Sequence, residues 1–318
     1  MTDTNITPTG TTPSSVAQEP TMKPTTTAEA PARSLTSDAW RYLRRRPLFW
    51  VSTVMIITLV LMAIAPSLFA HGDPYAADLS QSRAEPSAEA WFGRDIQGAD
   101  IYTLTIYGAR ASILVGVLTT IATLLIGAIV GTLAAYFGGI WDTLLMRVTD
   151  VFFAIPMLLG GILFMTSFPN PPDASFWVVV GKVVLVLSLF GWPSIARLMR
   201  GAILQIKDSE YVMAARALGA GTGRIIFRHL LPNAFAPALV VSTINLGTFI
   251  AAEATLSFLG IGLSSPAISW GLAISTGTDA IYAAPHILLF PSLFLSITVL
   301  AFILLGDAVR DAFDPKAR

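Results

Sequence analysis

The residues that most often perform chemistry are scarce in this chain and lie far apart. Its 318 residues include no cysteine, which excludes disulfides, iron–sulfur ligation and thiolate nucleophiles. The three histidines, His71, His229 and His286, are too widely spaced to form a recognisable metal motif. The sequence therefore predicts neither a metal site nor a redox function.

The sequence also lacks the common signatures of enzyme active sites. A phosphate-binding loop ends in Gly-Lys-Ser or Gly-Lys-Thr, whereas the run Gly219-Ala-Gly-Thr-Gly223 has no lysine and no preceding strand. Neither the His-Glu-x-x-His of zinc proteases nor the Gly-x-Ser-x-Gly of serine hydrolases occurs. We expect that this chain is not an enzyme and that any hydrolysis takes place on another chain.

Two charges, Lys182 and Glu253, stand inside long apolar stretches. If those stretches are helical, each residue lies about 10 Å below the outer end of its helix at 1.5 Å per residue. A lone charge at the bilayer centre costs about 2.5–3.5 kcal/mol, so we expect an ion pair, a translocation path or a subunit interface at these positions. The simpler alternatives are that Lys182 extends to the interface and that Glu253 hydrogen-bonds a partner helix.

Composition indicates that the helices around these residues cross a membrane. Hydrophobic residues make up 54% of the chain and charged residues only 13%, and the zero net charge gives no reason to expect nucleic acid. We expect an all-α integral membrane protein with six transmembrane helices, kinked at Pro66 and Pro156, because six stretches reach the roughly 20 apolar residues that span a bilayer core. They are Pro47–Ala70, Ala111–Tyr136, Val148–Phe168, Phe176–Ile195, Phe235–Ile261 and Ile287–Leu305.

The distribution of basic residues predicts the orientation, since Lys and Arg stay on the cytoplasmic side of short loops. With the first helix entering from the cytoplasm, 16 of the 20 basic residues fall on that side, and the exceptions are Arg83, Arg94, Arg110 and Lys182. Both termini are therefore expected in the cytoplasm.

The segments between the predicted spans divide the chain further. Residues 1–38 are rich in Thr, Pro, Ser and Ala and are expected to form a disordered cytoplasmic tail, followed by a membrane domain over 39–318. Residues of about 71–110 and 262–286 form external loops, and residues of about 196–234 form the main cytoplasmic loop.

This cytoplasmic loop is predicted to be a helical hairpin. Ser209 and Glu210 favour a helix start as cap and first-turn charge, and Gly219 favours a left-handed end. A second helix is expected from Thr222 to about Leu230, closing at 231–233. A DNA-binding helix-turn-helix is a poor alternative because both ends enter the membrane within a few residues. A connector without function is the other alternative; the small residues on the hairpin favour a docking surface.

The run from Glu210 to Asn233 resembles the EAA loop of bacterial ABC importer permeases. The matching positions are Ala214, Ala215, Gly219, Leu231 and Pro232. Met213 stands where the family has Glu, and His229 stands where it has Ile. The resemblance implies that the loop is a coupling helix docked on an ATPase subunit, through Glu210, Ala214, Ala215, Gly219, His229, Leu231 and Pro232.

Further segments are similar to the C-type permease of dipeptide and oligopeptide importers. They are Trp91-Phe-Gly93, Tyr107-Gly-Ala-Arg110, Glu253-Ala-Thr-Leu-Ser-Phe-Leu-Gly260, Ser269-Trp-Gly271 and Leu305-Gly-Asp-Ala-Val-Arg-Asp311. This resemblance implies a type I-like permease in the bacterial inner membrane that moves peptides by alternating access. Nickel chelates, glutathione or another small solute are alternative cargoes, and an ion-coupled secondary carrier is an alternative class.

The same resemblance implies the partners of the chain. They are a homologous B-type permease, two ATP-binding subunits, an extracytoplasmic substrate-binding protein and membrane lipid. No cofactor is expected on this chain, and ATP and Mg²⁺ are expected on the partner subunits.

Overall fold

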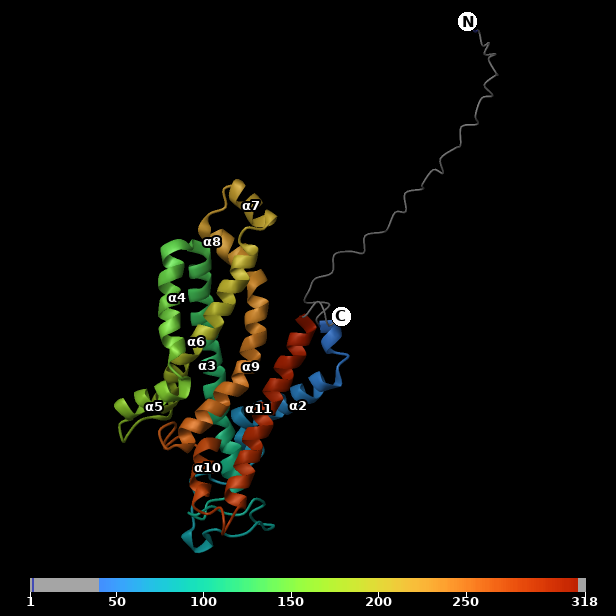
Figure 1. Cartoon of the computed structure of the whole chain (residues 1–318). Coiled ribbons are helices and arrows are strands. Elements are labelled where there is room, and N and C mark those ends of the chain that lie inside the picture. The colour runs from blue at the N-terminus through green and yellow to red at the C-terminus, as the bar shows by residue number, and fades with distance from the viewer. Residues whose placement is uncertain (1, 3–39, 314–318) are drawn as a thin grey trace. The chain divides into compact units, whose positions relative to one another are not determined.

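A computed structural model describes Thr2 and residues 40–313, and the predicted tail lies outside the described residues apart from Thr2. Residues 40–313 belong to one compact unit and form helices and turns without a β-strand (Figure 1). The long helices are α2 (Pro47–Ile64), α3 (Ile101–Phe137), α4 (Gly139–Ala154), α5 (Met157–Ser167), α6 (Phe176–Ile206), α9 (Leu231–Phe258) and α11 (His286–Phe313). The short ones are α7 (Glu210–Ala217), α8 (Thr222–Arg224), α10 (Trp270–Thr278), the 3₁₀ turns Pro66–Leu68 and Leu79–Gln81, and a π-helical turn, η3 (Ile225–Leu230).

The expected number of membrane spans is confirmed once a broken helix is counted as one span. Five helical segments within 40–313 are long and apolar enough to cross a bilayer: α2, α3, α6, α11 and the continuous run Thr222–Phe258. The sixth is the pair α4 and α5, whose axes are bent by 81°.

The third span consists of two helices separated by a break, whereas the sequence predicts a single kinked helix. Ile155 is extended (φ −86°, ψ 118°) and Pro156 follows it. Proline has no N–H to donate and disfavours helical conformation in the residue before it, so α4 ends and α5 restarts in a new direction. The helix also begins earlier than expected, at Gly139 instead of Val148.

Several other boundaries differ from the prediction. Helix α6 runs to Ile206 instead of Ile195, so the predicted loop of about 196–234 is shorter, and α11 runs to Phe313 instead of Leu305. Two further differences have local reasons. Helix α3 begins at Ile101 instead of Ala111, because the Asp100 carboxylate accepts a hydrogen bond from the Thr103 N–H at 2.9 Å and caps the helix. The first external loop therefore ends at Asp100. Helix α2 ends at Ile64, so Pro66 starts a 3₁₀ turn instead of kinking the span.

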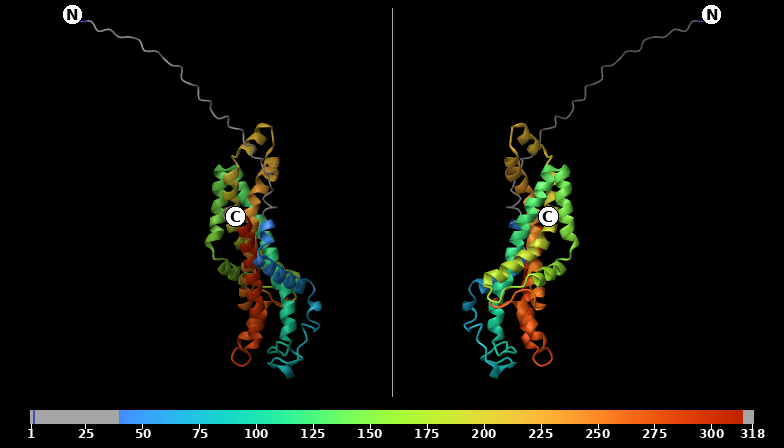
Figure 2. Two further views of the ribbon diagram at one scale, coloured as in Figure 1. Left: turned by 90° about the vertical axis from the view of Figure 1, so that its right-hand side faces the viewer. Right: turned by 90° about the vertical axis from the view of Figure 1, so that its left-hand side faces the viewer.

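Helices α3, α6 and α9 pack together at the centre of this unit (Figure 2). Small residues let α3 and α6 approach closely, since a Cβ on Gly127 would lie 2.6 Å from Cβ of Ile195, and one on Gly131 would collide with the Ala196 carbonyl. The hairpin of α7 and α8 lies at one end of the bundle, and α10 with the external loop lies at the other (Figure 1). Leu43 and Phe49 pack against Ala308 and Ala312, so the start of α2 meets the end of α11.

Candidate functional site

The predicted cytoplasmic loop folds into a helical hairpin with a sharply defined turn. Gly219 has φ +81°, a conformation that side-chain-bearing residues rarely adopt. The Ala220 N–H bonds to the Ala215 carbonyl at 3.0 Å, and the Gly219 N–H bonds to the Arg216 carbonyl at 2.9 Å. These two bonds form a Schellman motif that ends α7. The predicted left-handed end at Gly219 is confirmed.

The start of α7 follows the prediction only in part. Glu210 lies in the first turn, as expected, where its charge suits the positive end of the helix dipole. Ser209 occupies the cap position, but its hydroxyl donates to the Ile206 carbonyl at 2.7 Å and does not cap the helix. The Ile206 carbonyl, at the last residue of α6, has no intrahelical partner and accepts hydrogen bonds from both the hydroxyl and the N–H of Ser209, the latter at 3.1 Å.

The second helix of the hairpin does not close at residues 231–233. Helix α8 begins at Thr222 as predicted, passes through η3 and continues without interruption as α9 to Phe258. Pro232 lies in the first turn of α9, directly after η3. In this π-helical turn the Leu231 N–H bonds to the Ile226 carbonyl five residues earlier, so the missing N–H of Pro232 falls where the hydrogen-bond pattern shifts and the helix continues.

One side of the hairpin is anchored and the other is exposed. Val212, Ile225 and Leu230 are buried against the end of α6. In contrast, Leu218 is 90% exposed and Phe227 is 74% exposed, with Tyr211 and Met213 also exposed. Large exposed apolar side chains beside a packed underside are typical of surfaces that contact another protein.

Of the predicted docking residues, His229 takes part in the contacts between the two arms of the hairpin. The Asn233 side chain donates to the His229 carbonyl at 2.8 Å and lies 3.4 Å from the Tyr211 hydroxyl, and the Tyr211 and His229 rings are 6.3 Å apart. These contacts hold α7 against the second arm of the hairpin, which is formed by α8, η3 and the start of α9. Most of the predicted residues are exposed, namely Glu210, Ala214, Gly219 and Pro232, and the others are half-buried, namely Ala215, His229 and Leu231.

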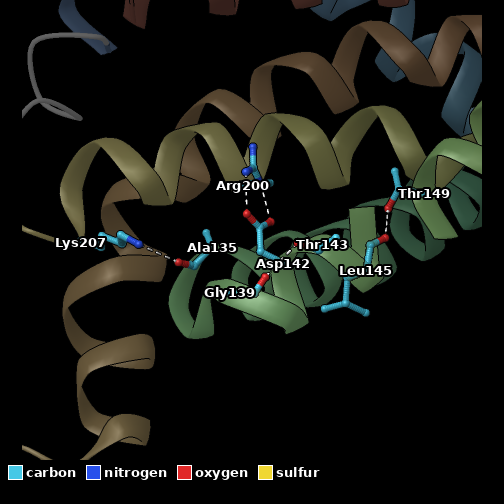
Figure 3. Close-up of polar contacts among 8 residues, drawn as sticks. All are labelled: Ala135, Gly139, Asp142, Thr143, Leu145, Thr149, Arg200 and Lys207. Carbon is cyan, nitrogen blue, oxygen red and sulfur yellow. Dashed lines mark hydrogen bonds and ion pairs between the residues drawn. The ribbon is translucent and has the colours of Figure 1, made fainter. Parts of the chain in front are cut away.

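The hairpin is connected to the bundle by polar contacts that the sequence analysis missed (Figure 3). Lys207, just before the hairpin, donates to the Ala135 carbonyl of α3 at 3.3 Å. About two helical turns before Lys207, Arg200 of α6 makes two hydrogen bonds of 2.6 Å to Asp142 of α4. The signal in the sequence was a pair of opposite charges at the same end of two consecutive spans, because such residues can meet when the spans pack side by side.

Lys182 and Glu253 are not brought together. The ion pairs among the described residues do not include them, and Glu253 is fully buried near the C-terminal end of α9. Its Oε1 accepts a hydrogen bond from the Ser257 hydroxyl at 2.7 Å, and Ser112 of α3 and Ser269 before α10 lie beside the carboxyl. Oε2 has no hydrogen-bond partner in the described part of the chain. Glu253 thus faces α3 and α10, whereas Lys182 is half-buried on α6.

Comparison with known proteins agrees with this geometry. Residues 124–318 match the family described as "Binding-protein-dependent transport system inner membrane component". Residues 34–86 match "N-terminal TM domain of oligopeptide transport permease C".

Individual relatives match over nearly the whole chain. The oligopeptide transport system permease protein OppC of Bacillus subtilis is 39% identical over 90% of this chain and 91% of its own length. The glutathione transport system permease protein GsiD of Escherichia coli is 35% identical over 88% of this chain and 90% of its own. Among solved structures, an inward-facing form of the MetNI methionine ABC transporter shares the fold, with a TM-score of 0.51 at 22% identity over 66% of this chain and 96% of that one. The chain therefore belongs to the inner membrane components of binding-protein-dependent transport systems, as a permease subunit of the ABC importer type.

Proposed function

We propose that this permease forms one half of the membrane channel of an ATP-driven importer of dipeptides and oligopeptides. Dipeptides and oligopeptides are the proposed cargo because the chain is 39% identical, over about nine tenths of both chains, to the oligopeptide and dipeptide permeases of Bacillus subtilis. In this proposal the chain pairs with a homologous B-type permease and receives cargo from an extracytoplasmic binding protein. The two ATP-binding subunits carry ATP and Mg²⁺, and this chain holds no cofactor.

The hairpin at 210–232 is the proposed contact with one ATPase subunit. Support comes from its exposed Leu218, Tyr211 and Met213 and from its connection to the bundle. Thr222 of the hairpin accepts a hydrogen bond from the Tyr136 hydroxyl of α3 at 3.4 Å. Just before the hairpin, Lys207 joins the end of α6 to α3, and Arg200 joins α6 to α4. When the ATPase subunits close, they would displace the hairpin, and these contacts would transmit the displacement to α3, α4 and α6. A coupled movement of these helices is what a switch of the channel between outward and inward access requires.

The proposed orientation places both termini and the hairpin in the cytoplasm. Support comes from the 16 basic residues on that side and from the packing of the start of α2 against the end of α11. The acidic loop before α3 then faces the extracytoplasmic binding protein.

Purification and uptake together test the proposal. The affinity-tagged chain, expressed with its neighbouring genes, is expected to copurify with a second permease and an ATPase. Vesicles that hold the complex and the binding protein are expected to accumulate labelled trialanine only when ATP is supplied. Uptake by the purified chain alone would instead identify a secondary carrier. Accumulation of glutathione but not trialanine would assign the cargo of the GsiD relative.

A further inference from the structure

A cavity of about 270 Å³ lies where α4 breaks into α5. Its walls come from the break itself, from α6 and from α9, and the residues that matter here are Phe153, Pro156, Ser194, Asn245, Thr248 and Phe249. None of the residues that line it is charged. It is separate from the hairpin and contains no residue of the predicted sites.

The polar side chains in this cavity are available to a ligand. The amide of Asn245 and the hydroxyl of Thr248 make no side-chain hydrogen bond within residues 40–313, and Thr248 is exposed while Asn245 is half-buried. Ser194 donates to the Gly191 carbonyl at 3.2 Å, which leaves its oxygen free to accept. Together these groups offer both donors and acceptors.

These groups lie at membrane depth. At 1.5 Å per residue, Thr248 and Asn245 are about 15 and 20 Å from the outer end of α9, and Ser194 is about 27 Å from the outer end of α6. A hydrocarbon core of about 30 Å places all three in its middle or inner half. A polar side chain without a partner is unfavourable in lipid, so this cavity is expected to hold water, a partner protein or cargo.

The break between α4 and α5 also indicates a water-filled or protein-covered space at this depth. The last turn of α4 leaves backbone carbonyls without intrahelical partners, and α5 restarts at 81° to it. Irregular backbone at membrane depth is tolerated where it is covered by protein or lines a water-filled space, and not against lipid. Interrupted helices with freed carbonyls are a recurring feature of sites that hold transported solutes.

Charged residues at the rim of the cavity indicate that this face of the protein contacts water. The pair of Asp150 and Arg197, joined at 2.7 Å, has side chains 49% and 41% exposed, and the Arg197 guanidinium lies 3.9 Å over the ring of Phe153 in the cavity wall. By contrast, the groove of about 680 Å³ between α3 and the start of α9 is lined almost entirely by apolar residues such as Leu125, Ile129 and Phe235. A half-exposed ion pair suits water, and an apolar groove suits lipid.

We infer that the cavity at the α4–α5 break is an aqueous segment of the translocation path, where Asn245, helped by Thr248 and Ser194, hydrogen-bonds the backbone amides of a passing peptide. A primary amide donates and accepts as a peptide bond does, so it matches any residue of the cargo. Because the residues that line the cavity are uncharged, they do not discriminate between peptides of different charge or sequence. The peptide part of this inference rests on the proposed function, whereas the aqueous part does not.

Thiol accessibility tests the aqueous part. Because the chain has no native cysteine, Ser194→Cys and Thr248→Cys each carry one thiol. In the assembled importer both are expected to react with a charged methanethiosulfonate reagent. The matched control for Ser194→Cys is Ile129→Cys in the apolar groove, which is 59% exposed and lies at the depth of Ser194, because Gly127 and Gly131 on either side of it contact Ile195 and Ala196. This control is expected to stay unreactive. Cavity cysteines as unreactive as this control would overturn the inference.

Uptake of trialanine tests the peptide contact. Asn245→Leu, which keeps the size but removes both hydrogen-bonding functions, is expected to lower the uptake rate about threefold to tenfold, while Asn245→Gln restores part of it. Copurification of the ATPase with each variant shows that the complex is assembled, and Thr248→Val gives a second, independent reduction. Wild-type uptake by assembled Asn245→Leu would overturn the contact. Reactive cavity cysteines in an importer that takes no trialanine would support the aqueous path and reject peptides as its cargo.

Discussion

Arg200 of α6 and Asp142 of α4 form a bidentate ion pair, in which Nε and Nη2 of the guanidinium each donate to one carboxylate oxygen at 2.6 Å. Their side chains are 35% and 21% exposed, so the pair is partly shielded from water. A parallel pair of this kind fixes the relative direction of the two groups as well as their distance. It therefore holds the first part of the broken third span against the helix that leads into the hairpin (Figure 3).

We predict that Arg200→Lys does not replace this arginine, because an ammonium group is a point charge and cannot make both bonds at once. A double-mutant cycle of Arg200→Lys with Asp142→Asn is expected to give a coupling of about 1 kcal/mol in thermal unfolding of the assembled importer. Arg147→Lys is a suitable control, since its nearest carboxylate contact is 4.0 Å away and its side chain is 80% exposed. Strictly additive effects in the cycle would show that the pair does not couple α4 to α6.

Replacement of Gly219 by valine is expected to uncouple ATP hydrolysis from uptake. A β-branched residue at φ +81° costs about 1–2 kcal/mol or more and shifts the second arm of the hairpin relative to α7. Gly223→Val is the matched control, because Gly223 lies in the same hairpin, has no positive φ and has open space around its Cα. The measurement is the ratio of trialanine imported to ATP hydrolysed. An unchanged ratio for Gly219→Val would mean that the turn does not transmit motion.

A cysteine at Leu218 is expected to crosslink to the ATPase subunit. Leu218 is 90% exposed at the tip of the hairpin, whereas Val212 in the same helix is fully buried and serves as the negative control. Paired with a series of cysteines along the surface of the ATPase, Leu218→Cys should give a disulfide-linked product on mild oxidation. If positions 213–218 all fail to crosslink while uptake persists, the hairpin is not the docking surface.

The orientation can be tested with an impermeant thiol reagent on cells with a permeabilised outer envelope. A cysteine at Ser87, in the acidic loop, is expected to be labelled, and a cysteine at Thr222, in the hairpin, is expected to be spared. Both positions are exposed in the structure, so a difference in labelling reports the side of the membrane and not burial. Disruption of the cells should then make Thr222→Cys reactive. The reverse pattern would place the termini outside.

Glu253 and Lys182 are expected to act independently, since the structure forms no ion pair between them. Glu253→Gln should be tolerated because an amide oxygen can still accept the hydrogen bond from Ser257. Glu253→Ala should cost about 1–3 kcal/mol through the loss of that bond and of packing between α3 and α10. Lys182→Met should add its own effect to either variant without rescue. Recovery of uptake in Lys182→Met with Glu253→Gln, relative to Lys182→Met alone, would show that the two charges are coupled after all.

The local elements of this protein follow from its sequence for a clear reason. In a bilayer each backbone N–H must find its carbonyl within the same helix, so a run of about 20 apolar residues already predicts a span. The same holds for the hairpin, where Gly219 ends α7 by a conformation that depends on neighbouring residues only. Short-range signals were misleading where the outcome depended on the surroundings, as for Pro232, which looked like a helix end and lies inside a continuous helix.

Contacts between distant residues were decided by the tertiary structure alone. Lys182 and Glu253 reach similar depths on successive spans, yet Glu253 is turned toward Ser112 and Ser269, because the rotation of a packed helix about its axis is set by its neighbours. For the same reason the sequence shows Asn245 and Thr248 only as isolated polar residues in an apolar run. The bend at Pro156 and the packing of α6 against α9 turn them into the wall of one cavity, because only side-by-side packing converts depth along a helix into distance between residues.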